Sequence, residues 1–224
     1  MSSISINDVL SFLDTHHDAF FRTQPLADKT CHPVPCDTRA WSQILISLLT
    51  GINGRKREKG SDLVDGSDVK AACCWGAIDT PRFNGAIPAG RLSETSRKAE
   101  DVTALDGMPF LFFVLWDDNT DGHPRCRVWC VRPQRDEVFR AMCSKWYEQR
   151  ATGQIRSTNF QLHPPRYRDD SIFRNKCGSL SYPLLFAAVR TERGFQETHF
   201  DPGVMQTGKC DDGRADSGSA EQGK

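Results

Sequence analysis

The sequence lacks the features that would carry this 224-residue chain into or across a membrane. Its longest unbroken apolar run, Phe110–Trp116, has seven residues, whereas a membrane-spanning helix needs about 20. The first residues also lack a basic stretch followed by an apolar one, which is typical of a secretory signal. We therefore expect a cytoplasmic protein with no membrane partner. Its length and its content of 38% hydrophobic residues are sufficient to bury a core.

Cysteine spacing typical of disulfide frameworks or zinc knuckles is also missing. Nine cysteines cannot all pair within the chain, and no Cys-x-x-Cys occurs, so free thiols in a reducing compartment are expected. Neither the segment Cys31–Cys36 nor the pair Cys126 and Cys130 has the spacing of a structural zinc site, and we interpret these cysteines as buried thiols. No acid stands at ligand spacing from His16 and His17, which are expected at the surface or at an interface.

The net charge is zero, which disfavours an indiscriminate polyanion binder. The distribution is nevertheless uneven: Arg125–Lys176 holds 12 Lys and Arg against 5 Asp and Glu, Arg55–Lys59 adds four bases and one acid, and Phe195–Lys224 has an excess of acids. The two basic segments could bind a phosphate-rich partner or could be solvated faces of strands and helices. No glycine-rich loop leads from a strand into a helix, which disfavours nucleotide hydrolysis.

Apolar periodicity predicts two helices at the start of the chain. Apolar residues recur at near-helical spacing over Val9–Phe21, after Asn7 as a candidate cap. The segment Trp41–Ile52 has the clearest 3.6-residue period in the chain, and Gly51 and Gly54 are expected to end this second helix.

Strand patterns dominate the middle of the chain. Pro109–Trp116 is continuously apolar, like a strand covered on both faces, and we expect Arg125–Arg132 to be its neighbour in the sheet. A helix is predicted from Asp136 to Gly153, a strand at Ser157–His163 and a last helix at about Ser181–Arg190. Together these elements predict a single domain of α/β or α+β class, of which we favour an α/β fold with a mixed central sheet flanked by helices.

The stretch Gly60–Lys70 places three carboxylates and a lysine around Asp65-Gly66, a dipeptide that favours a tight hairpin between Ser61–Val64 and Ser67–Trp75. Hard cations such as Mg²⁺ take oxygen ligands from one or two carboxylates and leave room for water and a phosphate. A lysine two residues after an Asp on a strand projects to the same face, where it can orient or deprotonate an attacking water. The stretch is therefore a candidate metal-dependent catalytic site.

The register of that hairpin decides which acids converge. A three-residue loop would place Asp62, Asp68 and Lys70 on one side, with cross-strand Cβ separations of about 5 Å. A two-residue loop would turn Asp62 to the opposite side and make Asp65 the substitute first acid. An Asp-x-Lys triplet is common in sequences, so a turn with solvated charges is the alternative interpretation.

The order of these elements resembles the core of PD-(D/E)xK nucleases, with Asp62 as the first acid, Asp68 as the second and Lys70 as the lysine. More specifically, the chain resembles type II restriction endonucleases of the MamI type over about residues 1–190. Two departures concern the first acid: Ser61 precedes it where the superfamily has proline, and its distance from Asp68 along the chain is short. The segments that carry the resemblance are Lys59–Lys70, Trp75–Gly85 and Asn159–Arg166.

The resemblance implies Mg²⁺-dependent, sequence-specific cleavage of double-stranded DNA by a homodimer at a palindromic site, continuous or interrupted. By this resemblance Asp62 and Asp68, with the Val69 carbonyl, hold the metal, and Lys70 positions the water. It also implies a restriction-endonuclease-like core in a single nuclease domain, residues 1–194. Residues 195–224, with few apolar side chains, are expected to be a disordered tail.

Site-specific cleavage requires side chains that read base edges, typically Arg at guanine and Asn or Gln at adenine. Two segments of the sequence offer such side chains, although each residue is also an ordinary surface type. The candidates for DNA binding are Arg82, Asn84, Asn159, Gln161, His163, Arg166 and Arg168.

Two other functions remain open at this point. The protein could be a non-catalytic DNA-binding or scaffold protein in which the acids of Gly60–Lys70 are structural. It could also be a repair or structure-specific nuclease of the same core, acting on damaged or branched DNA.

Overall fold

A computed structural model describes residues 5–29, 38–55, 60–75, 77, 80–87, 102–165, 172–175 and 177–206. The helices are α1 (Ile6–Lys29), α2 (Thr38–Thr50), α3 (Glu137–Ala151) and α4 (Gly203–Gln206), with a short 3-10 helix η1 (Val102–Leu105). The strands are β1 (Asp68–Cys73), β2 (Phe83–Asn84), β3 (Leu111–Asp118), β4 (Pro124–Val131), β5 (Gln161–Leu162), β6 (Ile172–Asn175), β7 (Gly178–Ser181), β8 (Leu184–Thr191) and β9 (Gly194–Phe200).

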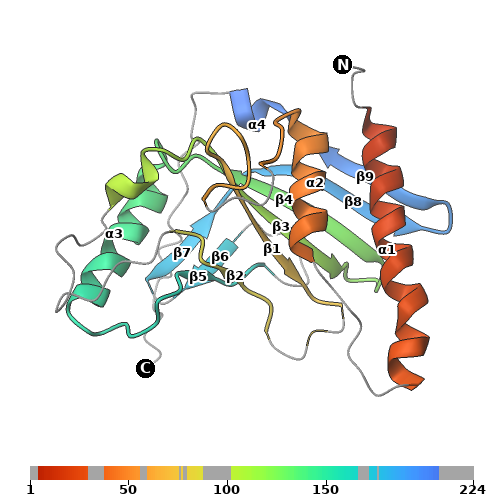
Figure 1. The fold of residues 1–224 in the computed structure, drawn as a ribbon, viewed down its shortest axis with the longest axis horizontal. Helices are drawn as coiled ribbons and strands as arrows, with labels where there is room; N and C mark the ends of the chain where they lie inside the picture. Colours follow the sequence, from red (N-terminus) through yellow and green to blue (C-terminus); the bar gives the residue numbers. More distant parts are fainter. Residues whose placement is uncertain are drawn as a thin grey trace, which may run out of the picture.

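Five strands form one mixed sheet in the order β1-β3-β4-β8-β9, so that β1 and β9 are its edges (Figure 1). Strand β1 runs parallel to β3, and the other neighbouring pairs are antiparallel. Two short antiparallel pairs, β2 with β5 and β6 with β7, lie outside this sheet. The observed α/β fold with a mixed sheet flanked by helices confirms the predicted fold class.

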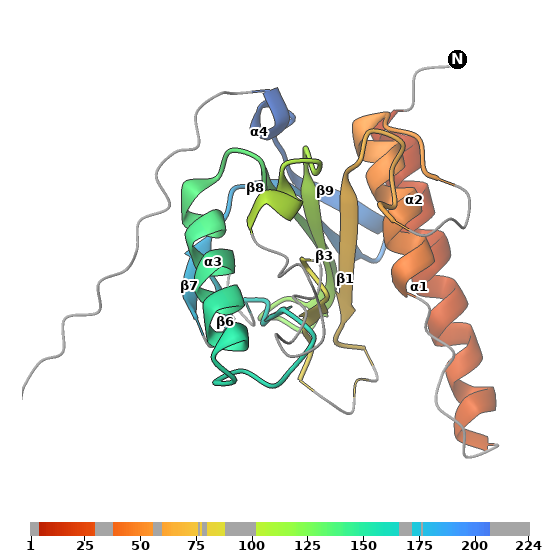
Figure 2. The same ribbon diagram turned by 60° about the vertical axis from the view of Figure 1, so that its left-hand side comes forward.

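Helices cover both faces of the sheet. Figure 2 shows α1 and α2 on one side of it and α3 with β6 and β7 on the other. The face under α1 and α2 buries Leu13, Leu45, Val114 and Val128 among others. The opposite face buries an aromatic-rich cluster that includes Phe113. Because both faces are covered, β3 is apolar along nearly its whole length.

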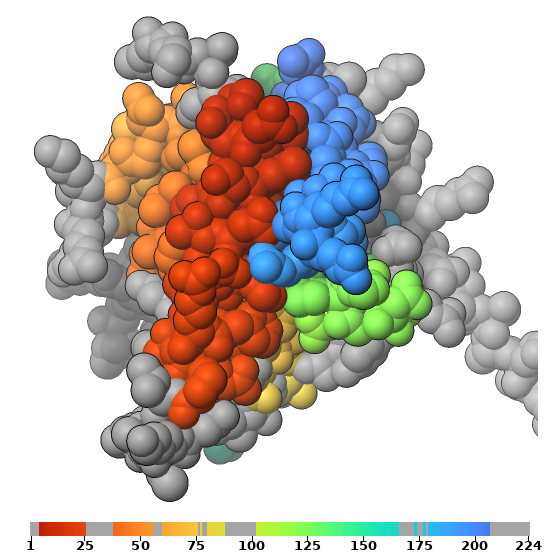
Figure 3. Space-filling view, turned by 90° about the vertical axis from the view of Figure 1, so that its right-hand side faces the viewer, coloured from red at the N-terminus to blue at the C-terminus, as the bar shows by residue number. Residues whose placement is uncertain are grey.

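The two N-terminal helices are confirmed, with one difference at the first cap. A capping box begins α1: the Ser5 amide donates to the Asp8 carboxylate at 2.8 Å, and the Asp8 amide donates to Ser5 Oγ at 3.3 Å. The cap is therefore Ser5 and not Asn7. Figure 3 shows α1 crossing one face of the molecule between α2 and the β8–β9 hairpin. None of the described helices is long and apolar enough to cross a bilayer.

The sequence predictions for β3, β4 and α3 are confirmed. Strands β3 and β4 are antiparallel neighbours, with Asp117 opposite Arg125. Helix α3 begins after Asp136, whose side chain accepts a hydrogen bond from the Phe139 amide. The strand expected at Ser157–His163 is shorter, because only Gln161 and Leu162 belong to β5.

The prediction of a final helix at Ser181–Arg190 is wrong. That segment ends β7 and forms most of β8, whose apolar run Leu184–Val189 fits a buried strand as well as a buried helix. The expected disorder from residue 195 is also wrong for 195–206, because β9 pairs with β8 and α4 follows it. Phe195 is 1% exposed in the core. Residues 207–224 lie outside the described part of the chain.

Candidate active site

The loop before β1 differs from the expected hairpin. Leu63 forms an isolated antiparallel bridge with Gly54, and the Asp62 carbonyl accepts a hydrogen bond from the Arg55 amide at 2.8 Å. Strand β1 instead pairs with β3. The predicted hairpin is therefore wrong in its pairing, although the turn expected at Asp65-Gly66 is present.

Asp65 stabilises this turn. Its carboxylate accepts hydrogen bonds from the Ser67 amide and the Ser67 hydroxyl, both at 2.9 Å. Gly66 follows with φ of 97°, and a Cβ at that position would lie 2.7 Å from the Gly107 carbonyl oxygen. Only glycine fits such a conformation and such a close approach without strain.

The turn brings the first and second predicted acids together. The Asp62 and Asp68 carboxyl groups share a hydrogen bond, and Asp62 Oδ2 also accepts from the Val69 amide at 3.1 Å. The Val69 amide donates to the carboxylates of both Asp62 and Asp68, whereas the prediction assigned a role to the Val69 carbonyl. Asp62 is thus positioned beside the start of β1 by a backbone contact and by its partner acid.

Different environments set the pKa values of the two acids apart. Burial, followed by the hydrogen bond with Asp62, raises the pKa of Asp68 to about 6, while Lys70 opposes this shift. Burial would also raise the pKa of Asp62, but hydrogen bonds with Asp68, Val69 and Arg39 outweigh it, so that this pKa lies below its usual range. Asp68 is therefore the acid of this pair that binds a proton more readily.

Lys70 completes the predicted constellation. Its Nζ lies 2.6 Å from Asp68 Oδ2, and the two side chains are 20% and 13% exposed. Both residues lie on β1 two positions apart, which places their side chains on the same face of the strand. The structure thus brings together Asp62, Asp68 and Lys70, as the sequence predicted.

Two contacts from α2 to the first acid were not anticipated. Gln43 Nε2 donates to Asp62 Oδ1 at 2.6 Å, and an Arg39 guanidinium nitrogen lies 3.2 Å from the same oxygen. The two residues are one helical turn apart, so they present to the same side of α2. That i, i+4 spacing was the available sequence signal, but it did not indicate which carboxylate they would meet.

The donor set fits a hard divalent cation. Two neighbouring carboxylates carry excess negative charge when both are ionised. Mg²⁺ is commonly bound by one or two carboxylates with water and phosphate oxygens. Within the described residues, no group of three or more His, Cys, Asp or Glu gathers as a larger metal site. A cation held here would therefore take its remaining ligands from water, the backbone or a substrate.

The structure joins the two segments that carry the predicted DNA-reading residues. Asn84 on β2 is directly opposite Gln161 on β5, and Phe83 is opposite Leu162. Phe83 and Leu162 are fully buried, whereas Asn84 is exposed and Gln161 half-buried. We call this pair of strands the β2–β5 ribbon. It packs beside β1, which carries Asp68 and Lys70.

The other candidates for DNA binding are only partly placed. Arg82 and Asn159 are exposed next to the β2–β5 ribbon, and His163 is half-buried just after β5. Arg166 and Arg168 lie outside the described residues.

The interpretation of the cysteines and histidines is confirmed in part. Cys126 and Cys130 are buried, and burial raises the pKa of the Cys130 thiol to about 12. The segment Cys31–Cys36 lies outside the described residues. The expected surface position of His16 is wrong, because its side chain is 3% exposed in the core.

A mixed sheet flanked by helices, with two carboxylates and a lysine at the start of an edge strand, is consistent with a restriction-endonuclease-like nuclease core. Sequence comparison identifies the particular family: residues 25–198 match the model of the MamI restriction endonuclease family. The chain therefore belongs to the MamI restriction endonuclease family. Among known proteins it is similar to the type II restriction enzyme MamI of Microbacterium ammoniaphilum, with 32% identity over 179 residues.

That similarity covers 76% of this chain and 57% of the relative, so the chain spans little more than half the length of the curated relative it matches. No solved structure matches the chain.

Proposed function

We propose that this protein is a type II restriction endonuclease that hydrolyses phosphodiester bonds in double-stranded DNA at a specific palindromic site. The observation that carries the proposal is the convergence of Asp62, Asp68 and Lys70 at the start of β1. Membership in the MamI family supports the same activity. A cytoplasmic location follows from the proposal, because an enzyme that restricts foreign DNA must meet it there.

Asp62 and Asp68 are the groups that would hold Mg²⁺, with the Val69 carbonyl as a further ligand. Bound there, Mg²⁺ supplies Lewis-acid stabilisation of the charge that develops on the scissile phosphate and its leaving oxygen. Both carboxylates must be ionised to act as ligands, so binding of the cation would compete with a proton on Asp68, whose pKa is raised to about 6. Gln43 and Arg39 fix Asp62 Oδ1, which leaves Asp62 oriented toward Asp68.

Lys70 would position the attacking water. Its ammonium is oriented by Asp68 at 2.6 Å, and it remains partly accessible to a substrate on the same face of β1. A positive charge at this position also attracts the phosphate backbone and stabilises the charge of the transition state. Removal of Lys70 is therefore expected to affect the rate of cleavage more than the binding of DNA.

The β2–β5 ribbon would supply sequence readout. The major groove of DNA admits a two-stranded β-ribbon, and amide side chains such as those of Asn84 and Gln161 bind adenine edges in a bidentate manner. Arg82, Asn159 and His163 flank these two residues in the structure. Arg166 and Arg168 remain proposed contacts on sequence grounds.

A homodimer follows from the symmetry of the proposed site. One constellation of two acids and one lysine cuts one strand, and a palindrome presents the same sequence twice around a two-fold axis. Two copies of the chain would therefore cleave both strands.

Titration of Mg²⁺ into the purified protein with unmethylated phage and plasmid DNA tests the proposal. We expect fragments of discrete size, with identical sequences at their ends, and no cleavage by a Lys70→Ala variant. A non-catalytic DNA-binding protein would give no fragments at any Mg²⁺ concentration. A structure-specific nuclease would cut branched or damaged DNA while leaving intact plasmid without discrete fragments.

A further inference from the structure

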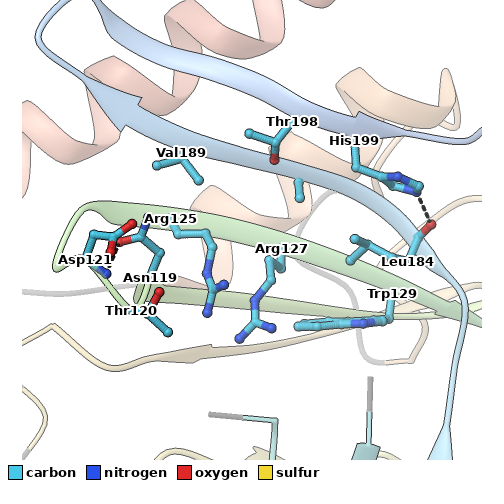
Figure 4. A pocket seen from close by; sticks show the side chains of 11 residues that line it. Asn119, Thr120, Asp121, Arg125, Arg127, Trp129, Leu184, Val189, Thr198 and His199 are labelled. Carbon is cyan, nitrogen blue, oxygen red and sulfur yellow. Dashed lines mark hydrogen bonds between the residues drawn. The ribbon is translucent and has the colours of Figure 1, made fainter. Parts of the chain in front are cut away.

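A polar cavity lies away from the candidate active site. It has a volume of about 340 Å³ and is lined by residues of β4, β8, β9 and the turn between β3 and β4 (Figure 4). Its wall contains two guanidinium groups, from Arg125 and Arg127, and the indole of Trp129. Thr198 and His199 on β9 are exposed, so the cavity meets solvent at that edge of the sheet.

The arginines in this wall are held in fixed orientations. Arg125 and Arg127 are 3% and 2% exposed, and both donate to the Asp117 carboxylate at 2.8 Å. Arg127 also donates to the Pro165 carbonyl at 2.8 Å and lies 4.8 Å from the centroid of the Trp129 ring. Guanidinium groups already fixed by the protein lose little entropy when they bind an anion.

Packed aromatic rings separate the cavity from the candidate active site. Strand β3 lies between β1 and β4 in the sheet. On this face the ring of Phe173 lies 5.2 Å from those of both Phe113 and Trp129. The cavity is therefore distinct from the constellation of Asp68 and Lys70.

We propose that this cavity binds a nucleoside monophosphate, with Arg125 and Arg127 facing its phosphate group. Guanidinium groups match the planar, bidentate hydrogen bonding of phosphate oxygens. Asp117 pairs with both arginines and Asp121 lines the cavity, so the two guanidinium groups offer fixed hydrogen-bond donors rather than an excess of positive charge. The volume lies at the lower end of the range for small-molecule sites, about 300–1,000 Å³, which is more than a bare phosphate requires.

Polar side chains at the edge of the cavity suit the nucleoside part. Asn119, Thr120 and Thr198 offer amide and hydroxyl groups that can hydrogen-bond to a base or sugar. His199 is anchored by a hydrogen bond between its Nε2 and the Leu184 carbonyl at 2.9 Å. The phosphomonoester could be a free nucleotide or the 5′-phosphorylated end of a DNA strand, which share the same chemistry.

Calorimetric titration of the full chain with dAMP, in the absence of divalent metal, tests this proposal. We expect saturable binding of one dAMP per chain, and Thr198→Trp, which fills the cavity from the exposed strand β9, should weaken it by about tenfold or more. Glu197→Trp is the matched control, because Glu197 is exposed on the same strand and does not line the cavity. Arg125→Gln should have the same effect as Thr198→Trp. If Arg125→Gln fails to fold, the dAMP affinities of Thr198→Trp and Glu197→Trp still test whether the cavity is the binding site.

Further ligands define the chemical class. Deoxyadenosine and inorganic phosphate should each bind at least about tenfold more weakly than dAMP. A 5′-phosphorylated oligonucleotide that competes with dAMP, when its 5′-hydroxyl form does not, would identify strand ends as the source. Failure of the oligonucleotide to compete would identify the free nucleotide.

Three results would overturn the proposal. They are no dAMP binding at millimolar concentration, equal affinity of wild type and Thr198→Trp for dAMP, and an affinity for deoxyadenosine or inorganic phosphate equal to that for dAMP. A Lys70→Ala variant should bind dAMP like the wild type. The outcome is therefore independent of the proposed cleavage activity.

Discussion

The ammonium of Lys70 lies 2.6 Å from Oδ2 of Asp68, two residues earlier on the same strand. This ion pair forms in a partly buried site, where charge interactions are stronger than in water. It fixes the lysine beside the acid whose pKa is raised to about 6. The two residues are therefore the strongest candidates for direct participation in cleavage.

We predict that Lys70→Ala lowers the rate of DNA cleavage by at least about 100-fold, the typical minimum contribution of a positioned proton-transfer group. DNA binding measured in Ca²⁺ should remain within about threefold of wild type, because many other contacts hold the duplex. Single-turnover cleavage and gel-shift assays provide the measurements. Lys145→Ala, which changes an exposed lysine on α3, should retain full activity. Full cleavage activity of the Lys70→Ala variant would show that Lys70 has no role in cleavage.

The hydrogen bond from Gln43 to Asp62 predicts a second effect. Gln43→Ala removes the donor at 2.6 Å from Asp62 Oδ1, so the carboxylate becomes less well oriented and the Mg²⁺ concentration for half-maximal cleavage should rise several-fold. The maximal rate at saturating Mg²⁺ should change less. Ile44→Ala, at a neighbouring residue of α2 that is 49% exposed, is the control. An unchanged Mg²⁺ dependence in Gln43→Ala would show that this contact does not position Asp62.

Local patterns allowed much of the fold to be predicted. The helical period of Trp41–Ile52 and the apolar run Pro109–Trp116 gave α2 and β3, because burial on one face or on both leaves a clear pattern in sequence. Strand β9 escaped prediction because it is an edge strand whose residues after Phe195 are exposed. Strand β9 is structured because it pairs with β8, a tertiary contact that its composition does not indicate.

In the candidate site, too, local spacing could be predicted from sequence whereas contacts between distant segments could not. Asp68 and Lys70 could be placed on one face from their spacing alone, because a strand alternates its side chains. The contact of Gln43 with Asp62 could not be predicted from sequence, because it depends on how α2 docks against β1. The pairing of Asn84 with Gln161 joins segments 77 residues apart in the chain, and no local pattern encodes it.

That pairing predicts altered specificity. Asn84→Ala and Gln161→Ala should each slow cleavage at the preferred site about tenfold and relax the base preference at one position per half-site, since a bidentate amide–adenine contact is worth about 1–3 kcal/mol. Cleavage of a library of randomised sites, followed by sequencing of the fragment ends, gives the measurement. Gln24→Ala, an exposed amide on α1, should leave the profile unchanged. Identical site profiles for all four proteins would exclude the β2–β5 ribbon from base readout.

Strand β9 predicts a stability effect at a position where the sequence suggested a dispensable tail. Phe195 is 1% exposed against the α1 side of the sheet, so Phe195→Ala should lower the free energy of unfolding by about 3–5 kcal/mol. Phe200→Ala on the same strand, where the side chain is 37% exposed, should cost much less. Urea unfolding curves of the two variants provide the comparison. Equal stability of Phe195→Ala and wild type would contradict the placement of β9 in the core.

His16 predicts a dependence of stability on pH. Its ring lies 4.4 Å from that of Trp116 and 4.6 Å from that of Trp41. Its Nε2 is buried, and no described residue forms a hydrogen bond with it. Burial, with a smaller contribution from His17, lowers the pKa of His16 from 6.5 to about 4. The folded state therefore favours the neutral ring, whereas the unfolded chain binds a proton near pH 6.5.

The sign of the effect follows from this difference. The unfolded state binds more protons between about pH 6.5 and 4, so the stabilisation is complete above pH 6.5 and declines as the pH falls toward 4, by up to about 3 kcal/mol. His16→Phe keeps an aromatic ring at this position and should lose less stability than wild type between pH 7.5 and 5. Urea unfolding of both proteins at these two pH values isolates the contribution, because the other titrating groups are common to both. Parallel losses of stability would show that His16 titrates normally.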